Sequence, residues 1–141
     1  MTTPTEDELR AIYAETKTIA VVGASADESK PSHRIPRYLQ SQGYRIIPVS
    51  PKGGEILGEH VYATLEEIEE PVDVVDVFRP AEEAPGIVRS AIGIGAKVVW
   101  LQSGIESIEA EEIADEAGIK IVMDRCMGVT HRHLGLGPGP D

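Results

Sequence analysis

The feature that most constrains the fold is a regular alternation of short apolar runs with helical stretches. The apolar runs, rich in Ile and Val, occupy residues 18–24, 45–49, 72–78, 97–101 and 119–123. The helical stretches occupy residues 5–16, 32–42, 64–69, 81–94 and 107–117. Runs that are apolar on both faces are typical of parallel strands, because such sheets are covered on both sides. The alternation therefore predicts an α/β protein with a five-stranded parallel sheet and helices on both faces.

The connections between the runs also predict the order of the strands. Short right-handed crossovers make 3-2-1-4-5 the most economical order, which is that of a doubly wound, Rossmann-like sheet. The order reverses between the first and fourth strands, and ligands of such sheets bind there, at the carboxyl ends of the strands. Two helix starts carry the pattern of a capping box, Thr5 with Glu8 and Thr64 with Glu67.

Length and cysteine content limit the class of protein. A chain of 141 residues predicts a single domain over residues 1–134, with residues 1–16 as an N-terminal helix packed on it. The glycine- and proline-rich residues 135–141 are expected to form a flexible tail. The chain has one cysteine, Cys126, and neither a signal-peptide pattern nor an apolar run of membrane-spanning length. We therefore expect a cytoplasmic protein.

The charge balance bears on partners and on salt. The chain has 13 basic and 24 acidic residues, for a net charge of −11. This balance argues against nucleic acid and against a bare membrane surface as partners. An acidic, lysine-poor surface suits a salt-rich cytoplasm, because salt screens the repulsion among carboxylates. The alternative is an acidic protein that has no need of salt.

A candidate phosphate loop follows the first apolar run. The N–H groups and partial positive charge of a helix N-terminus favour phosphate, and nearby basic side chains could add charge for a pyrophosphate. The later glycines of a dinucleotide fingerprint are missing, because Ser25 and Glu28 stand in their places. An ordinary strand-to-helix turn is therefore the alternative. The candidate residues are Gly23, Ala24, Ser25, Lys30, Ser32 and Arg34.

The second apolar run ends in Ser50, Pro51 and Lys52. An acid at this position hydrogen-bonds the 2′-hydroxyl of NAD, whereas a cation tolerates a phosphate on the ribose. Two common ligands carry such a phosphate, NADP at the 2′ position and coenzyme A at the 3′ position. Lys52 therefore favours one of these two ligands, with a solvated surface lysine as the alternative.

The third and fourth runs end in polar residues that belong to the same sheet edge. The third ends in Arg79 and Pro80, and the fourth in Gln102, Ser103 and Gly104. Arg79 could pair with a phosphate or with a neighbouring carboxylate. The side chains of Gln102 and Ser103 offer neutral hydrogen-bonding groups that suit an amide-bearing pantetheine arm. A plain turn before the last helix is the alternative.

No combination of residues predicts catalysis. A nucleophilic Cys126 would need a nearby base or a lowered thiol pKa, and a buried, inert thiol is the alternative. His131 and His133 form an i, i+2 pair with no second ligand cluster, so we predict no metal site. The chain also has no G-x-S-x-G nucleophile elbow. We therefore expect a binding protein and not an enzyme.

Taken together, these motifs resemble those of the small, single-domain CoA-binding protein family, which is similar to the nucleotide-binding domain of the succinyl-CoA synthetase alpha subunit. The resemblance runs from about residue 17 to residue 133. It is carried by IAVVGAS at 19–25, SHRIPRYL at 32–39, GYRIIPVSP at 43–51, EILG at 55–58, VDVVDVFRP at 72–80, IGAKVVWLQSGI at 94–105 and VMDRCMGV at 122–129.

The resemblance implies non-catalytic binding of coenzyme A or acyl-CoA, with the pyrophosphate at residues 23–25 and contacts from Phe78 to Pro80 and from Gln102 to Ile105. It places Cys126 near the thiol end of the ligand, where a mixed disulfide with CoA is conceivable. Ser50 stands where relatives usually have asparagine, which puts a direct ligand contact there in doubt. The phosphorylated histidine of the synthetase lies in a second domain, and no histidine here stands in a matching motif.

Two other functions stay open at this point. One is an NADP-dependent oxidoreductase, against which the missing later glycines argue. The other is a nucleotide-sensing regulatory subunit whose partner supplies the function. A homodimer is a further possibility, since small α/β domains often form dimers.

Overall fold

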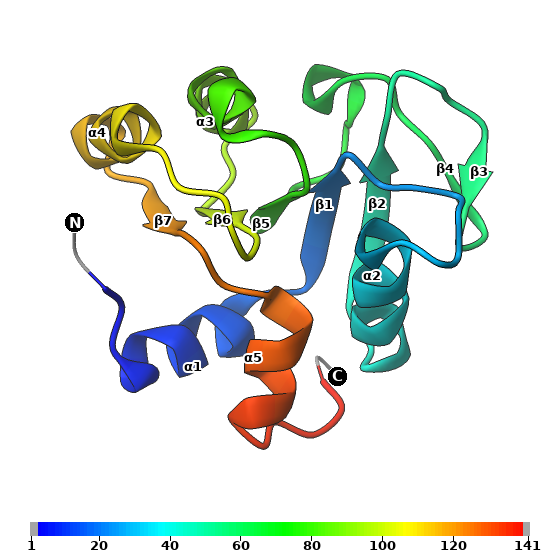
Figure 1. Ribbon diagram of the computed structural model, residues 1–141, viewed down its shortest axis with the longest axis horizontal. Coiled ribbons are helices and arrows are strands. Elements are labelled where there is room, and N and C mark those ends of the chain that lie inside the picture. Colours follow the sequence, from blue (N-terminus) through cyan, green and yellow to red (C-terminus); the bar gives the residue numbers. More distant parts are fainter. Residues whose placement is uncertain (1–2, 140–141) are drawn as a thin grey trace.

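A five-stranded parallel sheet forms the centre of the protein, in a computed structural model that describes residues 3–139 (Figure 1). Its strands run in the order β2-β1-β5-β6-β7, and all four neighbouring pairs are parallel. They are β1 (Thr18–Val22), β2 (Arg45–Val49), β5 (Val74–Val77), β6 (Val98–Leu101) and β7 (Lys120–Val122). A short antiparallel hairpin, β3 (Glu55–Ile56) and β4 (Glu59–His60), follows β2.

Helices cover both faces of the sheet (Figure 1). One face is covered by α1 (Glu6–Glu15), α2 (Pro31–Ser41) and α5 (Met127–His133), and the other by α3 (Ala84–Gly93) and α4 (Ile108–Ala117). Short 3₁₀ helices lie at Leu65–Glu67 and Ala81–Glu83. On the first face, Trp100 and Leu39 lie in the apolar core, and on the second face Val75 and Val88 do. The predicted doubly wound α/β fold is confirmed.

The order β2-β1-β5-β6-β7 matches the predicted 3-2-1-4-5 pattern, with one difference in which run of the chain fills each position. The edge position beside β2 is held by a single parallel bridge from Tyr62 to Val49, and this bridge takes the place of the third strand in the pattern. The expected third run, residues 72–78, instead lies next to β1. The Asp73 carboxylate helps to hold the start of this run beside β1, because its Oδ2 accepts hydrogen bonds from the N–H groups of Lys17 and Thr18, both at 2.9 Å.

Local signals at the helix ends agree with the structure in part. Thr5 and Glu8 form the predicted capping box, whereas the Thr64 side chain makes no capping hydrogen bond and only a 3₁₀ turn follows it. No sequence pattern indicated α5, a seven-residue helix. It packs closely on α2 because Gly128 has no side chain, and a Cβ there would lie 3.1 Å from Cγ2 of Ile35.

The C-terminal segment makes contacts with the domain. Leu136 packs against the core that contains Trp100, and the N–H of Gly139 donates a 2.8 Å hydrogen bond to the carbonyl of Gln42. The flexible tail was predicted over residues 135–141, of which 140 and 141 lie outside the described residues.

Candidate functional site

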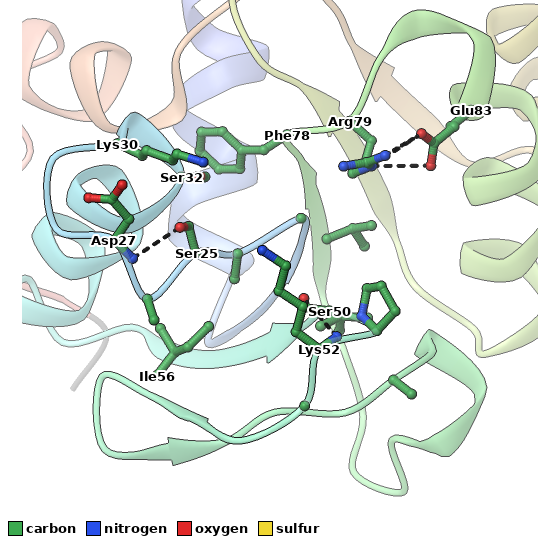
Figure 2. A pocket seen from close by; sticks show the side chains of 18 of the residues that line it. Ser25, Asp27, Lys30, Ser32, Ser50, Lys52, Ile56, Phe78, Arg79 and Glu83 are labelled. Carbon is green, nitrogen blue, oxygen red and sulfur yellow. Dashed lines mark hydrogen bonds and ion pairs between the residues drawn. The ribbon is translucent and has the colours of Figure 1, made fainter.

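A cleft of about 730 Å³ lies at the carboxyl ends of β1, β2 and β5. Its walls are the loop after β1, the turn after β2, the β3 strand of the hairpin and the start of the segment after β5 (Figure 2). This is the edge where parallel strands present their free ends and where the sheet order reverses. The position agrees with the site expected from the sequence.

Gly23 shapes the floor of the cleft. Its φ is +88°, in the left-handed region that side chains disfavour. A Cβ at Gly23 would also lie 2.9 Å from Cδ of Arg79 and 3.0 Å from the carbonyl oxygen of Phe78. The glycine therefore lets the loop after β1 pass directly beside the end of β5, which leaves its backbone open to the cleft.

The loop after β1 is held in shape by its own polar groups. The Ser25 hydroxyl accepts a hydrogen bond from the N–H of Asp27 at 3.0 Å. The Asp27 carboxylate in turn accepts from the hydroxyl and the N–H of Ser29, and these hydrogen bonds lower the pKa of Asp27. Nδ1 of His33 on α2 lies 2.8 Å from the carbonyl oxygen of Ser25. The loop is thus preformed before any ligand enters.

The first turn of α2 faces the same cleft. Lys30, its N-cap residue, makes no side-chain capping hydrogen bond, and the first turn contains no acidic residue. Both Lys30 and Ser32 line the cleft. An uncapped helix start with a basic residue next to it is an arrangement that favours an anion.

Ser50 and Lys52 form the turn on the opposite wall. The Ser50 hydroxyl accepts a hydrogen bond from the N–H of Lys52 at 3.3 Å, and the Ser50 carbonyl accepts from Gly53. Ser50 is buried, and its hydroxyl is held within the turn by the hydrogen bond from Lys52. Lys52 is exposed and its side chain extends into the cleft (Figure 2).

Three cationic side chains enter the cleft from three sides (Figure 2). Within residues 3–139, neither Lys30 nor Lys52 forms an ion pair with a carboxylate. Arg79 differs, because its Nε and Nη2 both donate to the Glu83 carboxylate, at 3.2 and 2.7 Å. This pairing raises the pKa of Arg79 and lowers the pKa of Glu83.

The structure brings together most, but not all, of the residues predicted for the site. Those that line the cleft are Gly23, Ala24, Ser25, Lys30, Ser32, Ser50, Pro51, Lys52, Phe78 and Arg79. Ser103 and Cys126 line a separate cavity of about 540 Å³ between α1 and α5. Arg34, Pro80, Gln102, Gly104 and Ile105 line neither.

Internal hydrogen bonds explain the position of the residues that follow β6. The buried Gln102 amide donates to the carboxyl group of Asp76, inside the sheet. The N–H of Gly104 donates to Oδ1 of Asp124 at 2.6 Å, and the N–H of Ile105 to the carbonyl of Gln102. These contacts fold the segment after β6 toward β7 and away from the cleft.

Several lining residues did not emerge from the sequence. Ile56 comes from the β3–β4 hairpin, which was not predicted, although Leu57-Gly58 between its strands is a turn with positive φ at both residues. Glu83 and Ile87 come from the segment after β5. The only available signal for Glu83 was its spacing of four residues from Arg79, which is typical of a helical ion pair.

The described residues also bear on metal binding and on insertion into a membrane. Within residues 3–139, no group of three or more His, Cys, Asp or Glu side chains is arranged to hold a metal ion. In the same range, none of the helices has the length and apolar character required to cross a membrane.

Comparison with known sequences points to one family. A family model described as a CoA binding domain matches residues 17–132. The uncharacterized protein YneT of Bacillus subtilis is 38% identical over 131 residues, which are 93% of this chain and 97% of that protein. An ADP-forming acetate–CoA ligase of Methanocaldococcus jannaschii is 27% identical over 128 residues. The match covers 85% of this chain but only 18% of that ligase.

Solved structures share the fold. A protein of Thermus thermophilus, cell-free ID.343, superposes with a TM-score of 0.89 and 46% identity, over 93% of this chain and 99% of that chain. The apo form of the dinucleotide-forming acetyl-coenzyme A synthetase 1 of Ca. Korarchaeum cryptofilum superposes with a TM-score of 0.66 and 28% identity. That match covers 77% of this chain and 26% of the synthetase.

Proposed function

The chain belongs to the CoA-binding domain family, and from this membership we propose that it binds coenzyme A or an acyl-CoA in the cleft at the carboxyl edge of its sheet. The pyrophosphate would lie against the loop at residues 23–25 and the start of α2, and Lys52 would meet the 3′-phosphate. The role proposed is binding without catalysis.

The observation that carries the proposal is the combination of a preformed loop with two unpaired lysines. Gly23 lets the loop backbone approach the cleft closely, and Lys30 and Lys52 face each other across it (Figure 2). In a protein with a net charge of −11, lysines that have no carboxylate partner in the described residues are available for a phosphorylated ligand. A ligand with phosphates at two separate points fits this spacing of charge better than a single phosphate does.

Calorimetric titration with CoA, dephospho-CoA, NADP and NAD at one ionic strength tests the proposal. We expect CoA to bind most tightly. Lys52→Ala should weaken CoA binding by about tenfold to a hundredfold, because one charge-assisted phosphate contact contributes about 1.5–3 kcal/mol. The same substitution should leave dephospho-CoA, which lacks the 3′-phosphate, nearly unchanged.

Lys120→Ala is the matched control. Lys120 is an exposed lysine at the start of β7, at the amino edge of the sheet, so its loss changes the net charge equally but removes no cleft contact. Equal losses for Lys52→Ala and Lys120→Ala would contradict the assigned position of the 3′-phosphate. Binding of NADP without binding of CoA would overturn the proposed function and favour the oxidoreductase alternative.

The absence of catalysis is a separate part of the proposal. It rests on the cleft itself, in which the titratable groups within reach are lysines, Arg79 and carboxylates, with no cysteine or histidine among the lining residues. Incubation with acetyl-CoA, followed by chromatography of the nucleotide, should return the thioester unchanged. Formation of free CoA at a rate above that of a protein-free control would contradict this part.

A further inference from the structure

We propose that Glu83 acts as an internal competitor for the ligand's pyrophosphate, because it occupies the guanidinium of Arg79, which the ligand would otherwise bind. This inference rests on the proposed function, since it assigns a regulating residue to the same site. Arg79 and Glu83 both line the cleft. The protein therefore binds the ligand less tightly than it would if Arg79 had no carboxylate partner.

The position of Arg79 places it at the phosphate loop. Its Cδ and Cγ lie where a Cβ of Gly23 would come within 2.9 and 3.2 Å. The side chain therefore runs across the glycine that opens the loop. The stem of Arg79 thus packs against the loop that is predicted to hold the pyrophosphate.

The guanidinium of Arg79 already forms an ion pair with the Glu83 carboxylate. Nε lies 3.2 Å from both carboxylate oxygens of Glu83, and Nη2 lies 2.7 Å from Oε2 (Figure 2). Glu83 ends the 3₁₀ helix Ala81–Glu83, four residues after Arg79. A carboxylate that accepts two parallel N–H bonds from a guanidinium presents the same geometry as a phosphate does.

The pair is weak enough for a ligand to displace. The side chains of Arg79 and Glu83 are 47% and 46% exposed, and ion pairs in water contribute little because the solvent screens them. A pyrophosphate carries more charge than one carboxylate and can also bind the N–H groups of the loop. The exchange of Glu83 for pyrophosphate on Arg79 is therefore favourable. The free energy of ligand binding is nevertheless smaller than it would be without Glu83, because the Arg79–Glu83 ion pair must first be broken.

The experiment measures affinity for inorganic pyrophosphate, CoA and dephospho-CoA by calorimetry. Glu83→Gln should bind all three about twofold to fivefold more tightly than the unaltered protein, the range that an exposed ion pair represents. Adenosine 3′-phosphate, which has no pyrophosphate, should show no such gain. Pyrophosphate serves as a probe that does not depend on CoA being the ligand, so a failure of the proposed function stays separate from a failure of this inference.

Two variants separate displacement from a general charge effect. Glu82→Gln removes the same charge from the neighbouring exposed residue, which does not line the main cleft, and should give a smaller gain. In an Arg79→Met background, which keeps the stem beside Gly23, Glu83→Gln should give no more gain than Glu82→Gln.

Four results would overturn the inference. The first is weaker pyrophosphate binding in Glu83→Gln, which would make Glu83 a ligand contact. The second is an equal gain in Glu82→Gln, and the third is a full gain that persists in the Arg79→Met background. No pyrophosphate binding to Glu83→Gln at all would also overturn it.

Discussion

At the scale of single residues, the buried carboxyl group of Asp76 differs strongly from a carboxyl group in water. It lies on β5 between Val21 of β1 and Trp100 of β6 and is fully buried. The Gln102 amide donates to one carboxyl oxygen, and the other has no partner in the described part of the chain. Burial raises the pKa of Asp76 to about 7, against the smaller opposing effect of the Gln102 hydrogen bond.

Because of this shift, the contribution of Asp76 to stability decreases as the pH rises. The folded state holds the Asp76 proton up to a pH of about 7, whereas the unfolded chain releases it near its ordinary pKa of about 3.9. The contribution of Asp76 to stability is therefore largest below the unfolded pKa and is lost as the pH rises to the folded pKa. Between pH 5.5 and pH 7, Asp76→Asn should gain about 2 kcal/mol of unfolding free energy relative to the unaltered protein.

Urea denaturation of both proteins at several pH values measures this difference. All other titrating groups are shared, so the difference between the two unfolding free energies isolates Asp76. A constant difference across the range from pH 5.5 to pH 8 would contradict a raised pKa. Above about pH 7.5 the difference should become flat.

The residues of the site could be predicted from the sequence only where position along a strand determines function. Gly23 and Lys52 follow apolar strands, and the ends of parallel strands share one edge, so their places in the cleft could be derived. The partnership of Gln102 with Asp76 could not, because it joins residues 26 positions apart through the register of β5 and β6. The polar side chain of Gln102 suggested a contact with a ligand. A buried carboxyl group such as that of Asp76 needs a hydrogen-bond donor in the same way, and sequence alone does not distinguish the two roles.

At the scale of elements, the strands and the longer helices were predictable because their apolar periodicity is strong. The hairpin β3–β4 and the helix α5 were not. Two-residue strands carry no periodicity, and β3–β4 is tied instead by contacts from elsewhere, such as Nη1 of Arg45 to Oε1 of Glu59 at 2.6 Å. α5 depends on packing between its Gly128 and Ile35 of α2, which no local pattern announces.

Helix capping gives a prediction at this scale, because two identical sequence patterns have different outcomes. Thr5→Ala should lower the free energy of unfolding by about 1 kcal/mol, since the Thr5 hydroxyl accepts from the N–H of Glu8 at 3.1 Å and α1 buries Leu9, Ile12 and Tyr13. Thr64→Ala is the matched control, and should change it by less than about 0.5 kcal/mol, because Thr64 makes no capping hydrogen bond. Urea denaturation measures both. Losses of equal size would contradict the assignment of the cap to Thr5 alone.

At the scale of the whole molecule, charge is distributed unevenly. The cleft at β1 and β2 holds cations, whereas α4 lies over the other end of the sheet, above β7 (Figure 1). The sequence of α4, IEAEEIADEA, contains five acidic residues and no basic one. Acidic residues near the C-terminal end of a helix interact unfavourably with its dipole. Exposed like charges four positions apart, such as Glu112 and Glu116, also repel each other.

Salt should therefore move stability and ligand affinity in opposite directions. Between 0.1 and 1 M KCl the screening length falls from about 10 Å to about 3 Å, which weakens the repulsion within α4 and across a molecule of net charge −11. We expect the melting temperature to rise over this range, while the affinity for CoA falls because salt also screens Lys30, Lys52 and Arg79. The double variant Glu112→Gln, Glu116→Gln removes the repulsion between these two residues and that of Glu112 with Glu109 and Asp115, three positions away. Each such pair contributes about 0.2–0.5 kcal/mol. The variant should flatten the melting response without altering the salt dependence of affinity. Thermal melts and calorimetric titrations on the same samples measure the two responses. A melting temperature that stays constant or falls with KCl would show that repulsion among the carboxylates does not limit the stability of this fold.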